Sequence, residues 1–72
     1  MTKNQIDYIT CVIGALAQMT GKSCSIIYRK LQSAELIKDY LAASYDVLHT
    51  FSLDYVAEDV IKLMKQKGYA LC

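Results

Sequence analysis

Apolar side chains recur every three or four residues along most of this 72-residue chain, and no proline interrupts the pattern. Near the start, Ile6, Ile9, Ile13 and Leu16 follow such spacings, which place them on one face of an α-helix. Glycine occurs only at positions 14, 21 and 68, and the last two coincide with the ends of periodic segments. The pattern predicts an all-α fold: a single helical domain over residues 1–72, organised as a small bundle of four to five short helices.

The expected helix boundaries in the first half follow from capping residues. The first helix is predicted over residues 4–20, with Gly21 in the left-handed conformation that ends a helix. The second should begin near Ser23, whose hydroxyl can accept a bond from a free backbone N–H, and continue to residue 32 or 33. A short third helix is predicted over residues 34–43.

The second half contains one ambiguous and one clear element. Residues 44–51 combine strand-favouring side chains with a potential N-cap at Ser44, and we expect a single helical turn there, with an extended segment as the alternative. The final helix should begin after a cap at Ser52 and end at Gly68. Its expected buried stripe consists of Val56, Val60, Leu63 and Met64, flanked by Leu53, Ala57 and Ile61.

Size and composition favour a partner. A chain of this length buries only about 60% of the surface that it exposes when unfolded, yet 54% of its residues are hydrophobic. We therefore expect binding to another protein, with a homo-oligomer as a second possibility. The net charge of +1 is too small to indicate nucleic acid as the partner.

Cysteine usage and hydropathy point to the cytoplasm. Cys11, Cys24 and Cys72 are odd in number and lack the spacing of a disulfide framework or zinc site. Cys11 and Cys24 are expected to be small buried hydrophobic residues. The apolar run over residues 9–19 is too short to span a bilayer and is predicted to be a core helix, so we expect neither a secretory signal nor a membrane partner.

Catalytic chemistry has one candidate residue. His49 is the only histidine, and Asp46 would share its face on a helical turn and could orient the imidazole. No convincing nucleophile accompanies them, and the alternative is that Asp46 caps backbone N–H groups while His49 packs at a helix junction. The run Thr20–Ser23 ends like a phosphate-binding loop but lacks its first glycine. We expect a non-enzymatic protein without cofactor or metal.

DNA binding is the alternative function. A helix, a glycine-containing turn and a second helix over residues 4–33 have the outline of a helix-turn-helix motif. A recognition helix would present Ser25, Arg29 and Gln32 to base edges and Lys22 to phosphate. Three positive charges in this segment are few for a DNA-binding surface.

Tyrosine supplies most of the aromatic side chains, with six residues and no tryptophan. Tyrosine is enriched in protein interfaces because it combines a large apolar ring with a polar hydroxyl. We predict a partner-binding surface centred on residues 45–49. Its residues are Tyr40, Tyr45, Asp46, His49 and Tyr55, whereas the remaining tyrosines are expected to edge the core.

The run Tyr45–Thr50 (YDVLHT), followed by LDYVAEDVIKLMKQKG, resembles a bacterial family known as domain of unknown function 3791. The resemblance covers roughly residues 4–69, and Phe51 departs from it where a polar residue is expected. The family has no established activity, so the resemblance assigns no catalytic residue. Such small proteins often look like companions encoded beside larger proteins, some resembling ADP-ribosyltransferase toxins, which implies an antitoxin-like or accessory role.

Overall fold

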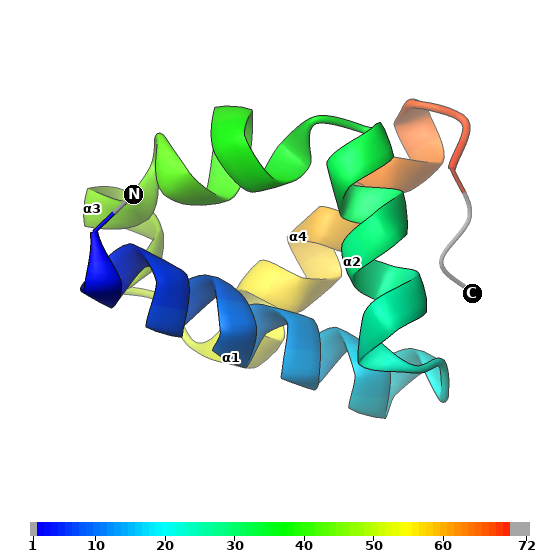
Figure 1. Ribbon diagram of the computed structural model, residues 1–72, viewed down its shortest axis with the longest axis horizontal. Coiled ribbons are helices and arrows are strands. Elements are labelled where there is room, and N and C mark those ends of the chain that lie inside the picture. The colour runs from blue at the N-terminus through cyan, green and yellow to red at the C-terminus, as the bar shows by residue number, and fades with distance from the viewer. Residues whose placement is uncertain (1, 70–72) are drawn as a thin grey trace.

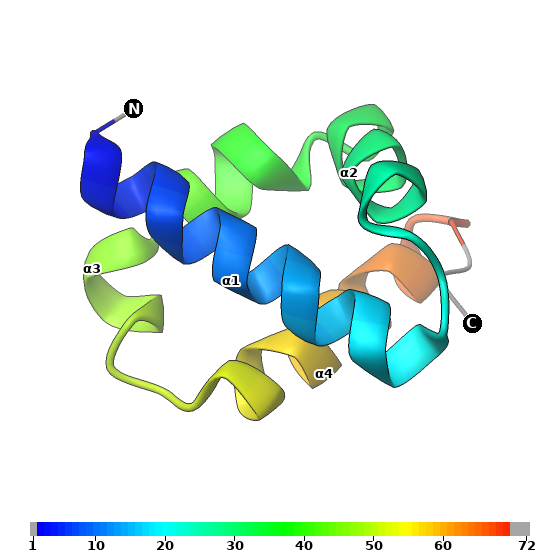
Figure 2. The same ribbon diagram turned by 60° about the horizontal axis from the view of Figure 1, so that its bottom comes forward.

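The computed structural model describes residues 2–69, which fold into five helices and contain no strand. They are α1 (Lys3–Thr20), α2 (Cys24–Ser33), the π-helix η1 (Ile37–Ala42), α3 (Tyr45–Leu48) and α4 (Leu53–Gln66). The predicted all-α bundle is therefore confirmed. In Figure 1 the long helix α1 crosses the molecule, and Figure 2 shows it lying between η1 and α4, with α3 near its N-terminal end and α2 near its C-terminal end.

Side-chain caps begin three of the helices. Ser23 and Ser52 accept hydrogen bonds from the backbone N–H groups three residues later, as their positions in the sequence predict. Thr2 and Gln5 form a reciprocal capping box at the start of α1, so this helix begins one residue earlier than expected. Ser44 occupies the predicted N-cap position of α3, but its side chain makes no cap bond.

Two glycines end helices as predicted. Gly21 adopts φ 72°, and its N–H donates to the Ala17 carbonyl over 2.9 Å. Gly68 adopts φ 88° after α4, where Tyr69 N–H donates to the Met64 carbonyl over 2.8 Å, the bond that characterises a Schellman motif. The Gly-Lys-Ser triplet thus forms the connection between α1 and α2.

The core is a single cluster of aliphatic side chains from all five helices and the α2–η1 connection. Half-buried Tyr8 and Tyr40 pack against it. Its members are Ile9, Val12, Ile13, Leu16, Ile27, Leu31, Ala34, Leu36, Ile37, Leu41, Ala42, Leu48, Val56, Ala57, Val60 and Met64. No polar or charged residue in the described part of the chain belongs to it.

Several residues expected in the core are exposed. On α1 the buried stripe runs only from residue 9 to residue 16, so Ile6 and Met19 lie beyond its two ends. Cys11 lies on the side of α1 opposite this buried stripe, and Cys24 is the first residue of α2. Both thiols are free and exposed rather than buried. Tyr28, Tyr69 and Leu53 are also exposed, so their predicted core positions were wrong.

The third helix is wider than the predicted α-helix. Glu35 takes the left-handed conformation, with φ 60°, and separates α2 from the π-helix that follows. Hydrogen bonds in a π-helix link residues five apart, and the buried pairs Leu36–Leu41 and Ile37–Ala42 have this spacing. The Gln5 side-chain amide donates to the Ala42 carbonyl over 3.1 Å, which ties the end of η1 to α1.

None of the helices formed by residues 2–69 has both the length and the apolar character that a membrane crossing requires.

Candidate functional site

Large apolar side chains are exposed where α3 turns into α4. The exposed fraction is 60% for Val47, 58% for Tyr55 and 46% for Phe51, and Leu53 is exposed between them. The Phe51 and Tyr55 rings pack against each other with centroids 5.1 Å apart. We name these four side chains the α3–α4 patch. They lie within nine consecutive residues, and clustered exposure of this kind is typical of interaction sites.

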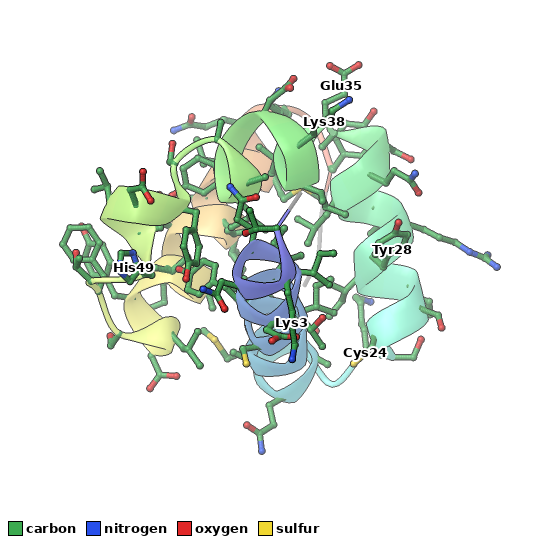
Figure 3. The ribbon with its side chains drawn as sticks, turned by 60° about the vertical axis from the view of Figure 1, so that its left-hand side comes forward. Lys3, Cys24, Tyr28, Glu35, Lys38 and His49 are labelled. Carbon is green, nitrogen blue, oxygen red and sulfur yellow. The ribbon has the colours of Figure 1, made fainter. Side chains whose placement is uncertain are left out.

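The His49 ring lies next to the patch and is fixed by Tyr45. The two rings stack with centroids 4.8 Å apart and an angle of 16° between their planes. The His49 Nδ1 lies 2.7 Å from the Tyr45 carbonyl oxygen. Because a carbonyl oxygen can only accept, Nδ1 carries the proton in this contact, and in the neutral imidazole Nε2 is left as an acceptor. His49 lies at the periphery of the molecule in Figure 3.

Tyr8 connects this pair of rings to α1. Its ring meets that of Tyr45 edge to face, with centroids 5.5 Å apart and an interplanar angle of 73°. The Tyr8 hydroxyl is buried and has no hydrogen-bond partner among the described residues. Burial, and to a smaller extent the nearby Tyr45, raises the pKa of Tyr8. Tyr8, Tyr45 and His49 therefore form a row of rings that holds α3 against α1.

Tyr40 links η1 to α4. Its hydroxyl donates a hydrogen bond to the Asp59 carboxylate. Burial of the ring raises the pKa of Tyr40 above its ordinary value, and the hydrogen bond and negative charge of Asp59 raise it further. Tyr8 and Tyr55 also lie close enough to contribute to this shift. Because its hydroxyl bonds to Asp59 and its ring packs on the core, Tyr40 holds η1 against α4 and offers little free surface to a partner.

The structure brings together most of the residues predicted to bind a partner. Tyr45 and His49 are in direct contact, and Tyr40 lies near Tyr55. Asp46 is exposed, and no hydrogen bond joins it to His49 in the described part of the chain. The sequence-based site missed Phe51, although its spacing of four residues from Tyr55 was a usable signal.

A catalytic dyad of Asp46 and His49 is not formed, because the imidazole contacts the Tyr45 carbonyl instead. The alternative expectation was also wrong in part: Asp46 makes no side-chain cap bond, and His49 is exposed rather than packed at a junction. Among residues 2–69, no group of three or more His, Cys, Asp or Glu side chains is arranged to hold a metal ion.

The residues of the DNA-binding alternative lie on a different face. Ser25, Arg29 and Gln32 line one groove between α1 and α2, with a volume of about 580 Å³. Its remaining lining residues are Thr10, Ile13, Cys24 and Tyr28. Lys22 is half-buried in the connection before α2 and does not line it. In Figure 3, Cys24 and Tyr28 lie on the side of the molecule opposite His49.

Comparison with known proteins identifies the family but no function. The model of a family described as protein of unknown function (DUF3791) matches residues 7–67, from the first turns of α1 to the end of α4. Searches of curated proteins and of solved structures gave no match. Because the family model covers most of the chain and confirms the resemblance carried by the YDVLHT run, this chain belongs to the DUF3791 family of proteins of unknown function.

Proposed function

We propose that this chain is a small, non-enzymatic module that binds one partner protein through the α3–α4 patch. The observation that carries the proposal is the exposure of Val47, Phe51, Leu53 and Tyr55 within nine residues. Removing a side chain such as Phe or Leu from water contributes about 1.5–3 kcal/mol. A partner that covers several of these side chains gains much of the free energy needed for a stable complex.

The patch has a rigid support, which favours binding. Stacking of Tyr45 on His49 fixes α3, and the bond from Tyr40 to Asp59 joins η1 to α4. Side chains that are already ordered lose less conformational entropy on association, so more of the contact free energy remains as affinity.

The biological role that we propose is that of an antitoxin-like or accessory companion in the bacterial cytoplasm. The family resemblance supports the companion role. The free, exposed thiols of Cys11 and Cys24 support a reducing compartment, since such thiols are prone to oxidation outside it.

Recovery of the partner by affinity purification tests this proposal. The tagged protein is expressed in cells that carry its own gene neighbourhood. A co-purifying protein is then identified by mass spectrometry, and the complex is reconstituted from purified components. We expect a 1:1 complex by light scattering. Phe51→Ser should weaken it about tenfold or more, because about 1.4 kcal/mol corresponds to a tenfold change in Kd.

Tyr28→Ser provides the matched control for that experiment. Tyr28 has the same exposed fraction as Phe51, 46%, but lies on the side of the molecule opposite His49, which precedes Phe51 by two residues. Its substitution should change the Kd by less than about twofold. Equal affinities of wild type and Phe51→Ser, with both proteins folded by circular dichroism, would contradict the proposal.

DNA binding is a second candidate, favoured by the shared position of Ser25, Arg29 and Gln32 on one groove. This function predicts that the protein binds the promoter of its own gene. The affinity should fall steeply with rising salt concentration, because contacts to phosphate release bound counterions. Arg29→Ala should weaken such binding and leave the protein complex intact. An electrophoretic mobility assay without a salt-sensitive shift excludes this function.

A further inference from the structure

The segment that carries the α3–α4 patch is predominantly negative, and the first positive charge after it is Lys62 on α4. Residues 39–61 contain five acidic residues and neither lysine nor arginine. Asp46, Asp54 and Glu58 are exposed, whereas the fourth acid near the patch, Asp59, is engaged by Tyr40. An apolar surface with such a rim favours a partner whose contact residues are positively charged.

An exposed ring and an exposed carboxylate lie side by side on α4. Tyr55 and Glu58 are three residues apart in the same helix and both are exposed, so they are neighbours on its surface. The Phe51 ring extends the aromatic surface beside Tyr55, tilted by 32°. Lys3, the first residue of α1, lies at the same end of the bundle as α3 but apart from His49 in Figure 3. Lys62 is exposed one turn after Glu58 on α4, but no ion pair joins the two among the described residues, so ring faces and a carboxylate are available together.

We infer that the α3–α4 patch, if it binds a partner as proposed above, recognises an arginine side chain of that partner. A planar guanidinium can stack on the Tyr55 and Phe51 rings while its N–H groups donate to the Glu58 or Asp54 carboxylate. A lysine ammonium can form the ion pair but lacks the planar face that stacks on rings. The partner segment thus carries an arginine flanked by apolar residues.

A second copy of the chain is the competing occupant. Arg29 is the sole arginine in the sequence and is exposed on α2. It lies on the groove between α1 and α2, with the neighbouring Tyr28 on the side opposite His49 in Figure 3. Such a contact would join copies head to tail, an arrangement that continues into open assemblies unless it closes into a ring. A partner protein is therefore the occupant to which we commit.

Two synthetic peptides test this inference. One is a 12-residue amphipathic peptide with leucines and three arginines, and the other replaces each arginine by citrulline, which has nearly the same shape but no charge. Backbone amide shifts of the ¹⁵N-labelled protein report the binding position and affinity. We expect the arginine peptide to shift residues 45–58 and to bind at least about tenfold more tightly than the citrulline peptide. Added salt should weaken its binding.

Substitutions separate the acidic rim from general charge effects. Glu58→Gln should weaken binding of the arginine peptide about fivefold. Glu35 is far from His49 in Figure 3, and Glu35→Gln should remove the same charge without changing the affinity. Equal binding of the two peptides, equal effects of the two substitutions, or no shifts at residues 45–58 would each overturn the inference. So would self-association in sedimentation velocity that Arg29→Lys abolishes, because a second copy would then be the occupant.

The outcomes for the two proposals differ. If Phe51→Ser abolishes partner binding but Glu58→Gln does not weaken it, the patch binds an apolar segment and only the arginine inference fails. If Phe51→Ser leaves partner binding unchanged, the proposed function itself fails.

Discussion

Removal of the Tyr40 hydroxyl should destabilise the protein, whereas removal of the Tyr8 hydroxyl should not. Both rings pack against the core, and Tyr→Phe leaves each ring in place. Tyr40 donates to the Asp59 carboxylate, so Tyr40→Phe takes away a hydrogen bond to a charged group. Such bonds contribute about 1.5–3 kcal/mol when buried. Because Tyr40 and Asp59 are only half-buried and water can replace part of the bond, we expect a loss of about 1–2 kcal/mol.

The opposite result is expected at Tyr8. Its hydroxyl is buried without a partner in the described part of the chain, and an unsatisfied buried group costs about 1–3 kcal/mol. Tyr8→Phe removes that cost along with the hydroxyl. We therefore expect the free energy of unfolding to stay unchanged or to rise by up to about 1 kcal/mol.

Urea denaturation followed by circular dichroism measures both effects. For a small protein with a slope near 1 kcal/mol per molar urea, Tyr40→Phe should lower the midpoint by about 1–2 M. A double-mutant cycle with Asp59→Ala isolates the coupling between Tyr40 and Asp59. If Tyr8→Phe destabilises the protein as much as Tyr40→Phe, the Tyr8 hydroxyl has a hydrogen-bond partner and the argument from its burial is refuted.

Three further predictions concern single positions. Glu35→Gly should raise the thermal midpoint by a few degrees in calorimetry, because the left-handed conformation at φ 60° costs a non-glycine residue about 1 kcal/mol; an unchanged or lower midpoint would contradict this. Ser52→Ala should lower the free energy of unfolding, measured by urea denaturation, by about 1 kcal/mol because the α4 cap is lost. Ser52→Asp should keep most of the wild-type stability, because an aspartate can also cap the helix. The raised pKa of Tyr40 means that the unfolded chain loses this proton at lower pH than the folded protein. Stability from this group is complete below about pH 10 and declines above it, so wild type should lose more stability than Tyr40→Phe between pH 9 and pH 11 in urea titrations.

The ends of the helices were determined largely by the sequence itself. Ser23 and Ser52 cap the helices that follow them, and Gly21 and Gly68 end helices, all at predicted positions. These interactions join groups within a few residues of one another, so the identity of the local residues decides them. The helical turn of α3 was also predicted, but the Ser44 side-chain bond on which that prediction relied does not form.

The candidate site was predictable only in part. The spacing of the tyrosines and His49 indicated where exposed rings would gather, and Tyr45 and His49 do stack. The role of Tyr40 was not predictable, because its hydroxyl bonds to Asp59, nineteen residues away in the sequence and on another helix. Phe51 was treated as a departure from a family pattern, whereas the structure exposes it beside Tyr55.

Which apolar residues are buried was decided by the tertiary structure. Periodicity placed Ile6 and Ile9 on the same helical face, yet only Ile9 is buried, because burial depends on how far the neighbouring helices extend along α1. The same holds for Leu53 and Val56 on α4. The sequence determines faces and ends, since these follow from contacts within one or two helical turns. The packing of the five helices determines which part of each face stays open, and thereby leaves the α3–α4 patch exposed.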